Sequence, residues 1–552
     1  MDLPRAARLL RPAQSLGVFC LVLSWMCVAS CGPEKRGGAA GNSIEASDFD
    51  VEEFKAAMRA TLPSITADSG GKKEVANIQM GLRRAYEASA YSPLWLSEEG
   101  EAGRAEKLLA DLEELRWDGL SPEAYGLPAL KQQAQKLKDA DVVSLISFDT
   151  ACTGAYLRAS RDLLLGVVSV RRADSLWFHA NDSVWTAPEM LARDGEYPSF
   201  DSFRSTIPTY TILRKEHRRL AELSQNNAFI SAKASLVDSG ASDSLITSVI
   251  DAELPAAAST GPDSLQGTKR LLAAYQAHYG LKQTAKADST TLKYLRRHPD
   301  SSARVVRANL ERLRWLPRQF SDRYVLVNVP LMELFYREGG RDEFTMRVVV
   351  GRPSRQTPTL SAPMANVVFN PPWGVPPTIL KNDVLPGIAR RGGAYLARKG
   401  LTAYDRRGRP VNAGAINARN YTKYNFRQPP GAHNALGEIK FNMPNRWDIY
   451  LHDTPHREDF PKRNRALSSG CVRVQKPKEF AEFILAKIEG RQEFDQYRID
   501  SLISTRVTKF ENLETELPVH IVYLTAFEDG SGGVRFLEDI YKKDRKLLAL
   551  VP

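Results

Sequence analysis

The spacing of apolar residues changes near residue 300, and this change limits the folds open to the chain. Before it, apolar side chains recur every three or four residues, as they do along 104–116 and 144–165. That period predicts amphipathic helices. After it come short alternating or β-branched runs bounded by Pro and Gly, which predict strands. These runs are 324–329, 344–350, 449–451 and 520–525. We therefore expect a multidomain α+β protein, helical first and β-rich last.

The chain has 552 residues, which is too long for one compact core. The predicted segments are a leader over 1–31, a flexible tether over 32–75, a helical scaffold over 76–230, a small helical unit over 231–300 and a β-rich domain over 301–552. Residues 378–428 interrupt the β-rich domain with a basic stretch rich in Gly, Arg and Asn, and a helix is expected near 383–389. We interpret this stretch as an inserted lid or cap.

The N-terminus has the architecture of an export signal. Basic residues at 5, 8 and 11 precede an apolar stretch over 16–28 that is too short to span a bilayer. The stretch ends in VASCG, which resembles a bacterial lipobox with Cys31 as the lipidated residue. We therefore expect a lipoprotein tethered to a membrane. The alternative is an ordinary cleaved signal with an accidental cysteine.

Five cysteines reduce to two in the expected mature chain, because two lie inside the leader and Cys31 would carry lipid. The remaining two are Cys152 and Cys471. Cys152 lies on the apolar stripe of the helix expected over 144–165, which indicates a packed core thiol. Cys471 lies in a polar motif, which favours reactivity. A disulfide between the two remains open.

Residues 449–474 concentrate the residue types that carry chemistry. His452 and His456 stand four apart, which superficially resembles a zinc-binding HExxH helix, but Pro455 interrupts the segment and strand-like residues precede it. In a second interpretation, each histidine is an ordinary structural residue whose ring forms hydrogen bonds and takes no part in catalysis. The third pairs Cys471 as nucleophile with His452 as its base.

Neighbouring residues fit the third interpretation. Gly470 permits a tight turn before Cys471, and amides around such a turn can serve as oxyanion donors. Arg473 lies two residues further on, so on a strand its side chain shares the face of Cys471. It is suited to bind a carboxylate and to lower the pKa of the thiol.

The strings YLHDTP and RALSSGCVRV resemble the active-site signature of L,D-transpeptidases, in which a histidine on one strand is followed by S-x-G-C, an apolar residue and Arg. The segments 309–317, 370–377, 430–437 and 440–444 resemble the long branch of this family, which has a helical scaffold, a wall-binding-like unit and a capping insert. The resemblance implies Cys471 as nucleophile and His452 as base. Many members have His where this chain has Ser469, which can still donate or accept a hydrogen bond.

Three further residues of the site remain ambiguous. Asp453 follows the histidine and either orients it or caps a turn. Tyr450 and Trp373 are pocket candidates, or else they pack in the core.

The unit over 231–300 resembles a degenerate peptidoglycan-binding repeat. Gln276, the pair 280–281 and the pair 291–292 match the repeat pattern, whereas its Gly-rich connection is missing. A helical spacer is the alternative interpretation.

The resemblance implies formation of 3→3 crosslinks between peptidoglycan stem peptides through a Cys471 thioester. The alternatives are an L,D-carboxypeptidase and a non-enzymatic wall-anchoring lipoprotein. We expect no metal and no cofactor. A nucleic-acid partner is not expected either, because the basic residues behind the net charge of +11 are scattered along the chain. The expected location is the periplasmic face of a membrane, where Cys31 would hold the lipid.

Overall fold

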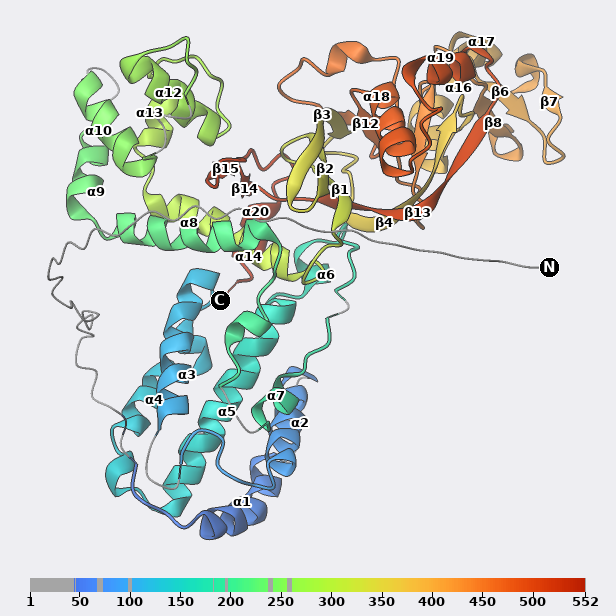
Figure 1. Ribbon diagram of the computed structural model, residues 1–552. Helices are drawn as coiled ribbons and strands as arrows, with labels where there is room; N and C mark the ends of the chain where they lie inside the picture. The colour runs from blue at the N-terminus through green and yellow to red at the C-terminus, as the bar shows by residue number, and fades with distance from the viewer. Residues whose placement is uncertain are drawn as a thin grey trace, which may run out of the picture. The chain divides into compact units, whose positions relative to one another are not determined.

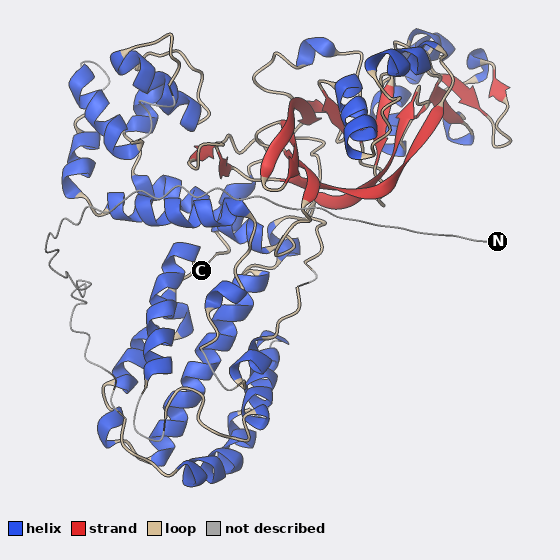
Figure 2. Ribbon diagram, viewed as in Figure 1, coloured by secondary structure: helices blue, strands red, loops and turns tan. Residues whose placement is uncertain are grey.

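The computed structural model describes residues 44, 46–66, 73–97, 102–181, 183–193, 197–236, 242–255 and 261–551. Helices make up the N-terminal half of the described chain and strands gather in the C-terminal half (Figure 2). The predicted α+β class is therefore confirmed. The leader and Cys31 lie outside the described residues.

The first helices pack around one apolar core. They are α1 (Val51–Ile65), α2 (Lys73–Ala88), α3 (Gly103–Glu114), α4 (Leu127–Ala134), α5 (Val142–Leu165) and α7 (Ala187–Leu191). Helices α6 (Val170–Ala173) and α8 (Pro208–Ser224) bury their apolar residues in a second core. Helix α5 lies along α3 and α4 (Figure 1). It starts where the Asp141 carboxylate accepts a hydrogen bond from the amide of Ser144, and it ends at Gly166. Cys152 is fully buried on this helix, as its place on the apolar stripe predicted.

The tether predicted for 32–75 is wrong over residues 51–65. These residues form α1, which begins with the Asp50 side chain accepting hydrogen bonds from the amides of residues 52 and 53. Phe54, Met58 and Leu62 are spaced four apart, so they share one helical face, and that face is buried in the scaffold core. The surrounding Gly-, Ser- and acid-rich composition hid this short apolar period.

A second set of helices follows and shares a core with the end of the chain. These helices are α9 (Asn227–Ala234), α10 (Asp243–Glu253), α12 (Gly267–His278), α13 (Ser289–Leu295) and α14 (Pro299–Arg314). Gln276 of the repeat-like motif is buried, and its side-chain amide forms hydrogen bonds with Thr284 in the connection to α13 and with Thr291 in α13 itself. The motif glutamine therefore has a structural role in joining the two helices.

Strands of the C-terminal half form a nine-stranded sheet within the described chain, in the order β11-β3-β12-β10-β9-β4-β13-β1-β2. They are β1 (Arg323–Asn328), β2 (Glu333–Glu338), β3 (Arg341–Gly351), β4 (Leu360–Phe369), β9 (Ile439–Asn442), β10 (Leu451–His452), β11 (Ala466–Ser468), β12 (Val472–Val474) and β13 (Lys509–Val522). Strand β2 pairs with both β1 and β3, so the sheet closes on itself. Its interior is an apolar core, which α18 (Pro477–Glu482) and α19 (Gln496–Ser504) help to cover.

The stretch predicted as an insert over 378–428 forms a small sheet together with the residues just before it, with the order β5-β8-β6-β7. Its elements are β5 (Trp373–Gly374), α15 (Pro377–Ile379), a π-helical turn (Leu380–Val384), α16 (Leu385–Arg391), α17 (Gly393–Arg398), β6 (Thr402–Tyr404), β7 (Pro410–Val411) and β8 (Asn425–Gln428). A separate apolar cluster holds them together. We call residues 373–428 the cap.

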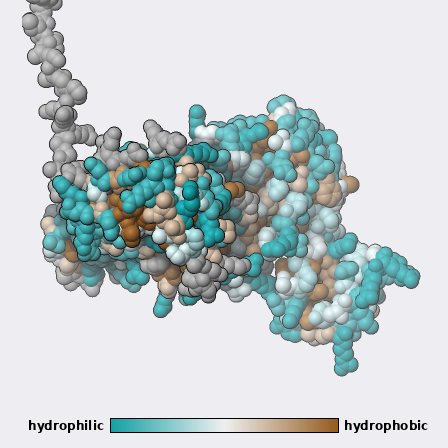
Figure 3. Space-filling model, turned by 90° about the horizontal axis from the view of Figure 1, so that it is seen from below, coloured by the Kyte–Doolittle hydropathy of each residue, from teal (hydrophilic) through white to brown (hydrophobic). Residues whose placement is uncertain are grey.

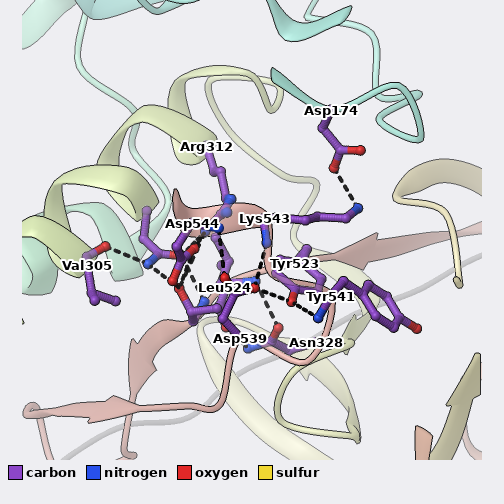
Figure 4. Close-up of polar contacts among 12 residues, drawn as sticks. Asp174, Val305, Arg312, Asn328, Tyr523, Leu524, Asp539, Tyr541, Lys543 and Asp544 are labelled. Carbon is purple, nitrogen blue, oxygen red and sulfur yellow. Dashed lines mark hydrogen bonds and ion pairs between the residues drawn. The ribbon is translucent and has the colours of Figure 1, made fainter. Parts of the chain in front are cut away.

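The last segment joins the helical and β-rich halves. It contains β14 (Ala526–Glu528), β15 (Val534–Phe536) and α20 (Lys543–Leu548). Asp544 of α20 pairs with Arg312 of α14 at 2.6 Å, and Thr525 donates a hydrogen bond to the same carboxylate (Figure 4). Asn309 exchanges two hydrogen bonds with Thr525, each 2.8 Å long. This buried polar network fixes α14 against the end of β13.

On the face seen from below, hydrophilic residues predominate among the coloured atoms, and hydrophobic residues form small patches between them (Figure 3). None of the described helices combines the length and the apolar character needed to cross a membrane.

Candidate active site

Strands β10 and β12 bring the two predicted catalytic residues together. They pair in parallel, with Leu451 opposite Val472 and His452 opposite Arg473. Leu451 and Val472 are fully buried in the core of the sheet. Because side chains alternate along a strand, His452 and Arg473 face the opposite side, and Cys471 lies just before β12 at the same edge. The amide of Val472 donates to the carbonyl of residue 450, which extends the pairing to Cys471.

The environment of His452 holds its ring neutral. The side chain is buried, and its Nδ1 lies 2.5 Å from the carbonyl oxygen of Asp453. A carbonyl can only accept, so the proton belongs on Nδ1 and Nε2 is the acceptor nitrogen. Burial, followed by the positive charge of Arg473, lowers the pKa of His452 to about 3. The ring is therefore a neutral proton acceptor at physiological pH.

The thiol of Cys471 is half-buried, and its Sγ lies 3.6 Å from the carbonyl oxygen of Asp448. Burial raises the pKa of this thiol, whereas hydrogen bonds from the backbone and side chain of Tyr450 and the charge of Lys440 act to lower it. The Lys440 ammonium lies 4.1 Å from the centroid of the Tyr450 ring. These groups oppose the effect of burial, although the pKa of Cys471 stays above its ordinary value, so the thiol needs a base to become a thiolate.

Tyr450 lies at the thiol, and Trp373 contacts Tyr450. The Tyr450 ring meets His452 edge to face, with centroids 5.7 Å apart. Burial and the neighbouring Cys471 raise the pKa of Tyr450, and a hydrogen bond from the Trp373 side chain opposes this rise. Trp373 belongs to β5, so the cap reaches the edge of the site.

Arg473 is partly buried, and its Nη1 lies 3.4 Å from a carboxylate oxygen of Asp459. Burial lowers the pKa of its guanidinium, while Asp459 and Cys471 act in the opposite direction. The side chain is a suitable donor for a substrate carboxylate beside the thiol.

Asp453 contacts both the histidine and a turn. Its backbone carbonyl orients His452, whereas its carboxylate accepts hydrogen bonds from the amides of Glu438 (2.8 Å) and Thr454 (2.6 Å). Gly437 has a positive φ of 63° and lies against this carboxylate, where a Cβ atom would meet Oδ2 at 2.3 Å. The carboxylate therefore caps the turn around Gly437, whereas the His452 ring is held by the backbone carbonyl of the same residue.

The residues before the nucleophile form the predicted tight turn. Gly470 has a φ of 128°, a conformation that favours glycine. Its amide donates to the Ser468 hydroxyl at 3.1 Å, and that hydroxyl donates to the carbonyl of Cys471 at 2.7 Å. The Gly470 amide is thus engaged in this arrangement instead of pointing to an oxyanion. Ser469 accepts a hydrogen bond from Arg355 at 3.1 Å.

The other histidine of the motif lies apart from this arrangement. His456 follows the strand in an exposed turn, and its Nδ1 faces Glu458 at 3.1 Å. It therefore does not share a helical face with His452, as an HExxH zinc site requires. Among the described residues, no group of three or more His, Cys, Asp or Glu is arranged to hold a metal. Cys152 and Cys471 are both free thiols, so the open disulfide interpretation is wrong.

Sequence reasoning missed two basic residues at the site. Lys440 lies opposite His452 on the neighbouring strand β9. Arg355 comes from the loop between β3 and β4. The signal for Lys440 was a matching stretch of sequence at 440–444, but its position beside the thiol depends on strand register. No local pattern marked Arg355.

The site defines a class of protein: a β-rich domain that presents a cysteine and a neutral histidine on adjacent strands, as acyl transfer requires. Residues 322–508 match the family model described as the L,D-transpeptidase catalytic domain, and residues 81–216 match a scaffold domain. The chain therefore carries an L,D-transpeptidase catalytic domain preceded by a scaffold domain.

A Haemophilus influenzae protein named "Putative L,D-transpeptidase" is 36% identical over 242 residues. The match covers 43% of this chain and 48% of that protein, so this chain spans about half of the relative's length. A solved structure of the Ldtfm-avibactam carbamoyl enzyme is 12% identical and covers 38% of this chain and 51% of that one, with a TM-score of 0.18. That likeness is too weak to support a conclusion about this chain.

Proposed function

We propose that this protein forms 3→3 crosslinks between peptidoglycan stem peptides through a thioester on Cys471. The observation that carries the proposal is the parallel pairing of β10, which carries His452, with β12, which begins directly after Cys471, with Tyr450 and Lys440 beside the thiol. The family of the catalytic domain supplies the substrate class.

In the first step, His452 takes the proton of Cys471, and the thiolate attacks the carbonyl carbon of the third residue of a tetrapeptide stem. The tetrahedral intermediate collapses, the bond to the terminal D-Ala breaks, and the His452 proton goes to the leaving amine. In the second step, the side-chain amine of the third residue of another stem attacks the thioester. His452 accepts the amine proton, and the Cys471 thiolate leaves and is protonated.

The remaining site residues have distinct tasks in this scheme. Arg473 binds a carboxylate of the donor stem, since its guanidinium shares the face of Cys471. Tyr450 and Lys440 stabilise the thiolate before attack. Trp373 contributes the cap side of the substrate pocket.

Product analysis by mass spectrometry tests this function. The full chain without its leader is incubated with a disaccharide-tetrapeptide, with Cys471→Ala as the paired variant. We expect a crosslinked dimer from the native enzyme and none from the variant. A shortened monomer in place of the dimer would assign an L,D-carboxypeptidase instead. Equal product from both proteins would contradict the role of Cys471.

A non-enzymatic wall anchor is distinguished by covalent labelling. Carbapenems acylate members of this family, so the intact mass of the native protein should rise by one adduct, which peptide mapping should place at Cys471. An unchanged mass would favour the anchor.

We also propose that Cys31 carries lipid and holds the protein at the periplasmic face of a membrane. The support is the basic, apolar and small-residue order of the leader. Metabolic labelling with a fatty-acid analogue should mark the native chain and not Cys31→Ser. Label on both chains would contradict the assignment.

A further inference from the structure

The loop that joins β3 to β4 forms a hydrogen bond with each of the three residues before the nucleophile, 468–470. The Arg352 amide donates to the carbonyl of Ser468 at 3.0 Å. Arg355 donates to the hydroxyl of Ser469 at 3.1 Å, and Thr357 donates to the carbonyl of Gly470 at 2.7 Å. We call residues 351–357 the holding loop. It touches consecutive residues, so its position sets the approach of the chain to Cys471.

The holding loop is itself tightly packed at both ends. Thr357 is fully buried, and its hydroxyl also accepts a hydrogen bond from the Gly351 amide at 2.8 Å. The Tyr541 hydroxyl donates to the carbonyl of Gly351 at 2.6 Å and lies 3.1 Å from the Thr357 amide. A Cβ atom on Gly351 would lie 2.2 Å from the carbonyl oxygen of Arg355, so the loop closes on a glycine that no other residue can replace without movement. The backbone at both ends of the loop is therefore fixed. The side chain of Arg355, which lies between these ends, can still change its conformation.

Arg355 connects this loop to the cap. Its guanidinium forms a two-point ion pair with Asp383, in which Nη2 lies 2.8 Å from Oδ1 and Nη1 contacts Oδ2. The Arg352 guanidinium approaches the same carboxylate at 3.9 Å. The hydrogen bond to Asp383 raises the pKa of Arg355. Asp383 lies in the π-helical turn of the cap, where the Tyr395 hydroxyl donates to its carbonyl at 3.2 Å.

A single nitrogen serves two partners at this junction. Nη1 of Arg355 donates to Asp383 and to Ser469. The planar guanidinium can do this because it presents several donors in a fixed fork, whereas an ammonium is a point charge. The carboxylate of Asp383 is 40% exposed, and an ion pair with one side in solvent is weak enough to open and close. When the cap is in place, Asp383 aims the guanidinium at Ser469.

We propose that Arg355 is a positioning residue that couples the cap to the nucleophile: Asp383 orients the guanidinium, and the guanidinium holds Ser469 and thereby Cys471. The catalytic half of this proposal rests on the proposed acyl transfer. Ser469 stands where many family members have histidine. Through its hydrogen bond with Arg355, its position then depends on the position of the cap. Release of Asp383 loosens the segment that carries the thiol.

Two readouts test the coupling, and only one requires turnover. The variants are Arg355→Lys, Asp383→Asn and the double variant, with the conservative Asp383→Glu as the rescue. The first readout is kcat and KM on the disaccharide-tetrapeptide. The second is the rate of Cys471 alkylation by iodoacetamide, followed by mass spectrometry of the Cys471 peptide. The control is Arg409→Met, which removes the Arg409–Asp405 pair inside the cap turn.

We expect kcat to fall about tenfold in each single variant with KM within about twofold, because the substrate still binds and only the approach geometry changes. The alkylation rate should rise about threefold, since a loosened segment opens locally more often. The double variant should be no worse than the single ones, because both act on one interaction. Asp383→Glu should recover most of kcat, and Arg409→Met should match the native protein in both readouts.

The outcomes separate this proposal from the proposed function. If the native protein forms no product but the alkylation rates change as expected, the coupling stands and the acyl-transfer assignment does not. Additive losses in the double variant, or an alkylation rate that is the same in all variants, would overturn the coupling. Thermal unfolding of each variant, with Tm within about 2 °C of the native value, shows that a change in stability is not the cause.

Discussion

The two free thiols show how differently the helical and β-rich halves treat the same side chain. Cys152 on α5 is fully buried, and burial together with the charge of Asp149 raises its pKa well above the ordinary value. Burial also raises the pKa of Cys471, but Tyr450 and Lys440 oppose that rise. The difference teaches that burial alone makes a thiol inert, and that adjacent donors and a cation create the conditions for a nucleophile.

Two buried histidines extend the comparison. Burial lowers the pKa of both His278 and His452 to about 3. The ring of His278 packs edge to face on Phe536, and within the described chain its Nε2 has no hydrogen-bond partner. His452 has the Asp453 carbonyl on Nδ1 and shares its face with Cys471. A depressed pKa therefore does not identify the catalytic histidine, whereas its place on the strand that pairs with β12, directly after Cys471, does.

The largest contrast should appear in thiol reactivity. In the native protein, iodoacetamide should modify Cys471 at least about a thousandfold faster than Cys152, because the core around α5 must open before Cys152 reacts. Peptide mass spectrometry after timed quenching measures both rates. In denaturant the two rates should converge, which serves as the control. Comparable rates in the native state would remove the distinction between the two thiols.

Replacement of the catalytic histidine is the second prediction. His452→Gln keeps a polar side chain but removes the base, so kcat should fall by about a thousandfold, within the usual range for loss of general base catalysis. His456→Gln is the matched control and should retain activity, since its side chain is exposed in a turn. Similar losses in the two variants would contradict the choice of base.

The pH dependence sharpens the same assignment. Because the pKa of His452 is about 3, its ring stays neutral well below pH 6. We therefore expect kcat/KM of the native enzyme to show no loss from histidine protonation between pH 7 and about 5.5, and its rise at higher pH to follow the thiol. A loss centred near the ordinary histidine value would show that the folded protein does not hold this ring neutral.

The sequence predicted the elements with long apolar periods and the residues of the local motif. The helix over 144–165 corresponds to α5, and the spacing of His452 and Cys471 proved to span adjacent strands. The prediction from sequence failed for α1, because the polar composition around it masked the few apolar residues that recur at helical spacing. Contacts across long separations also had no sequence signal: Arg355 and Ser469 are 114 positions apart and meet only because β11 pairs with β3.

The third prediction concerns stability: removal of one partner from the buried polar network around Arg312 and Asp544 should lower the free energy of unfolding. Asp544→Ala leaves the buried guanidinium of Arg312 without its ion pair, which should lower the free energy of unfolding by about 3–5 kcal/mol. Figure 4 shows this ion pair within its network. Chemical denaturation monitored by fluorescence measures the change in the free energy of unfolding. The double variant Arg312→Met with Asp544→Leu should recover much of it, because neither charge then remains unpaired. A double variant as unstable as the single one would show that the packing, and not the charge, is what matters.

The smallest expected effect is a difference between His278 and His452 in how each shapes the pH dependence of stability and of activity. A buried histidine with a folded pKa of about 3 and an unfolded value near 6.5 stabilises the protein fully above about pH 6.5 and loses that contribution as the pH falls, by about 1.4 kcal/mol per pH unit. His278→Leu removes this titrating group, so Tm should fall less steeply from pH 6.5 to 4.5 than in the native protein, while transpeptidation is retained. His452→Gln should flatten the same slope but lower the rate of product formation by about a thousandfold. If His278→Leu lowered that rate as much, the helical unit would have to contribute to catalysis, and the contrast between the two halves would fail.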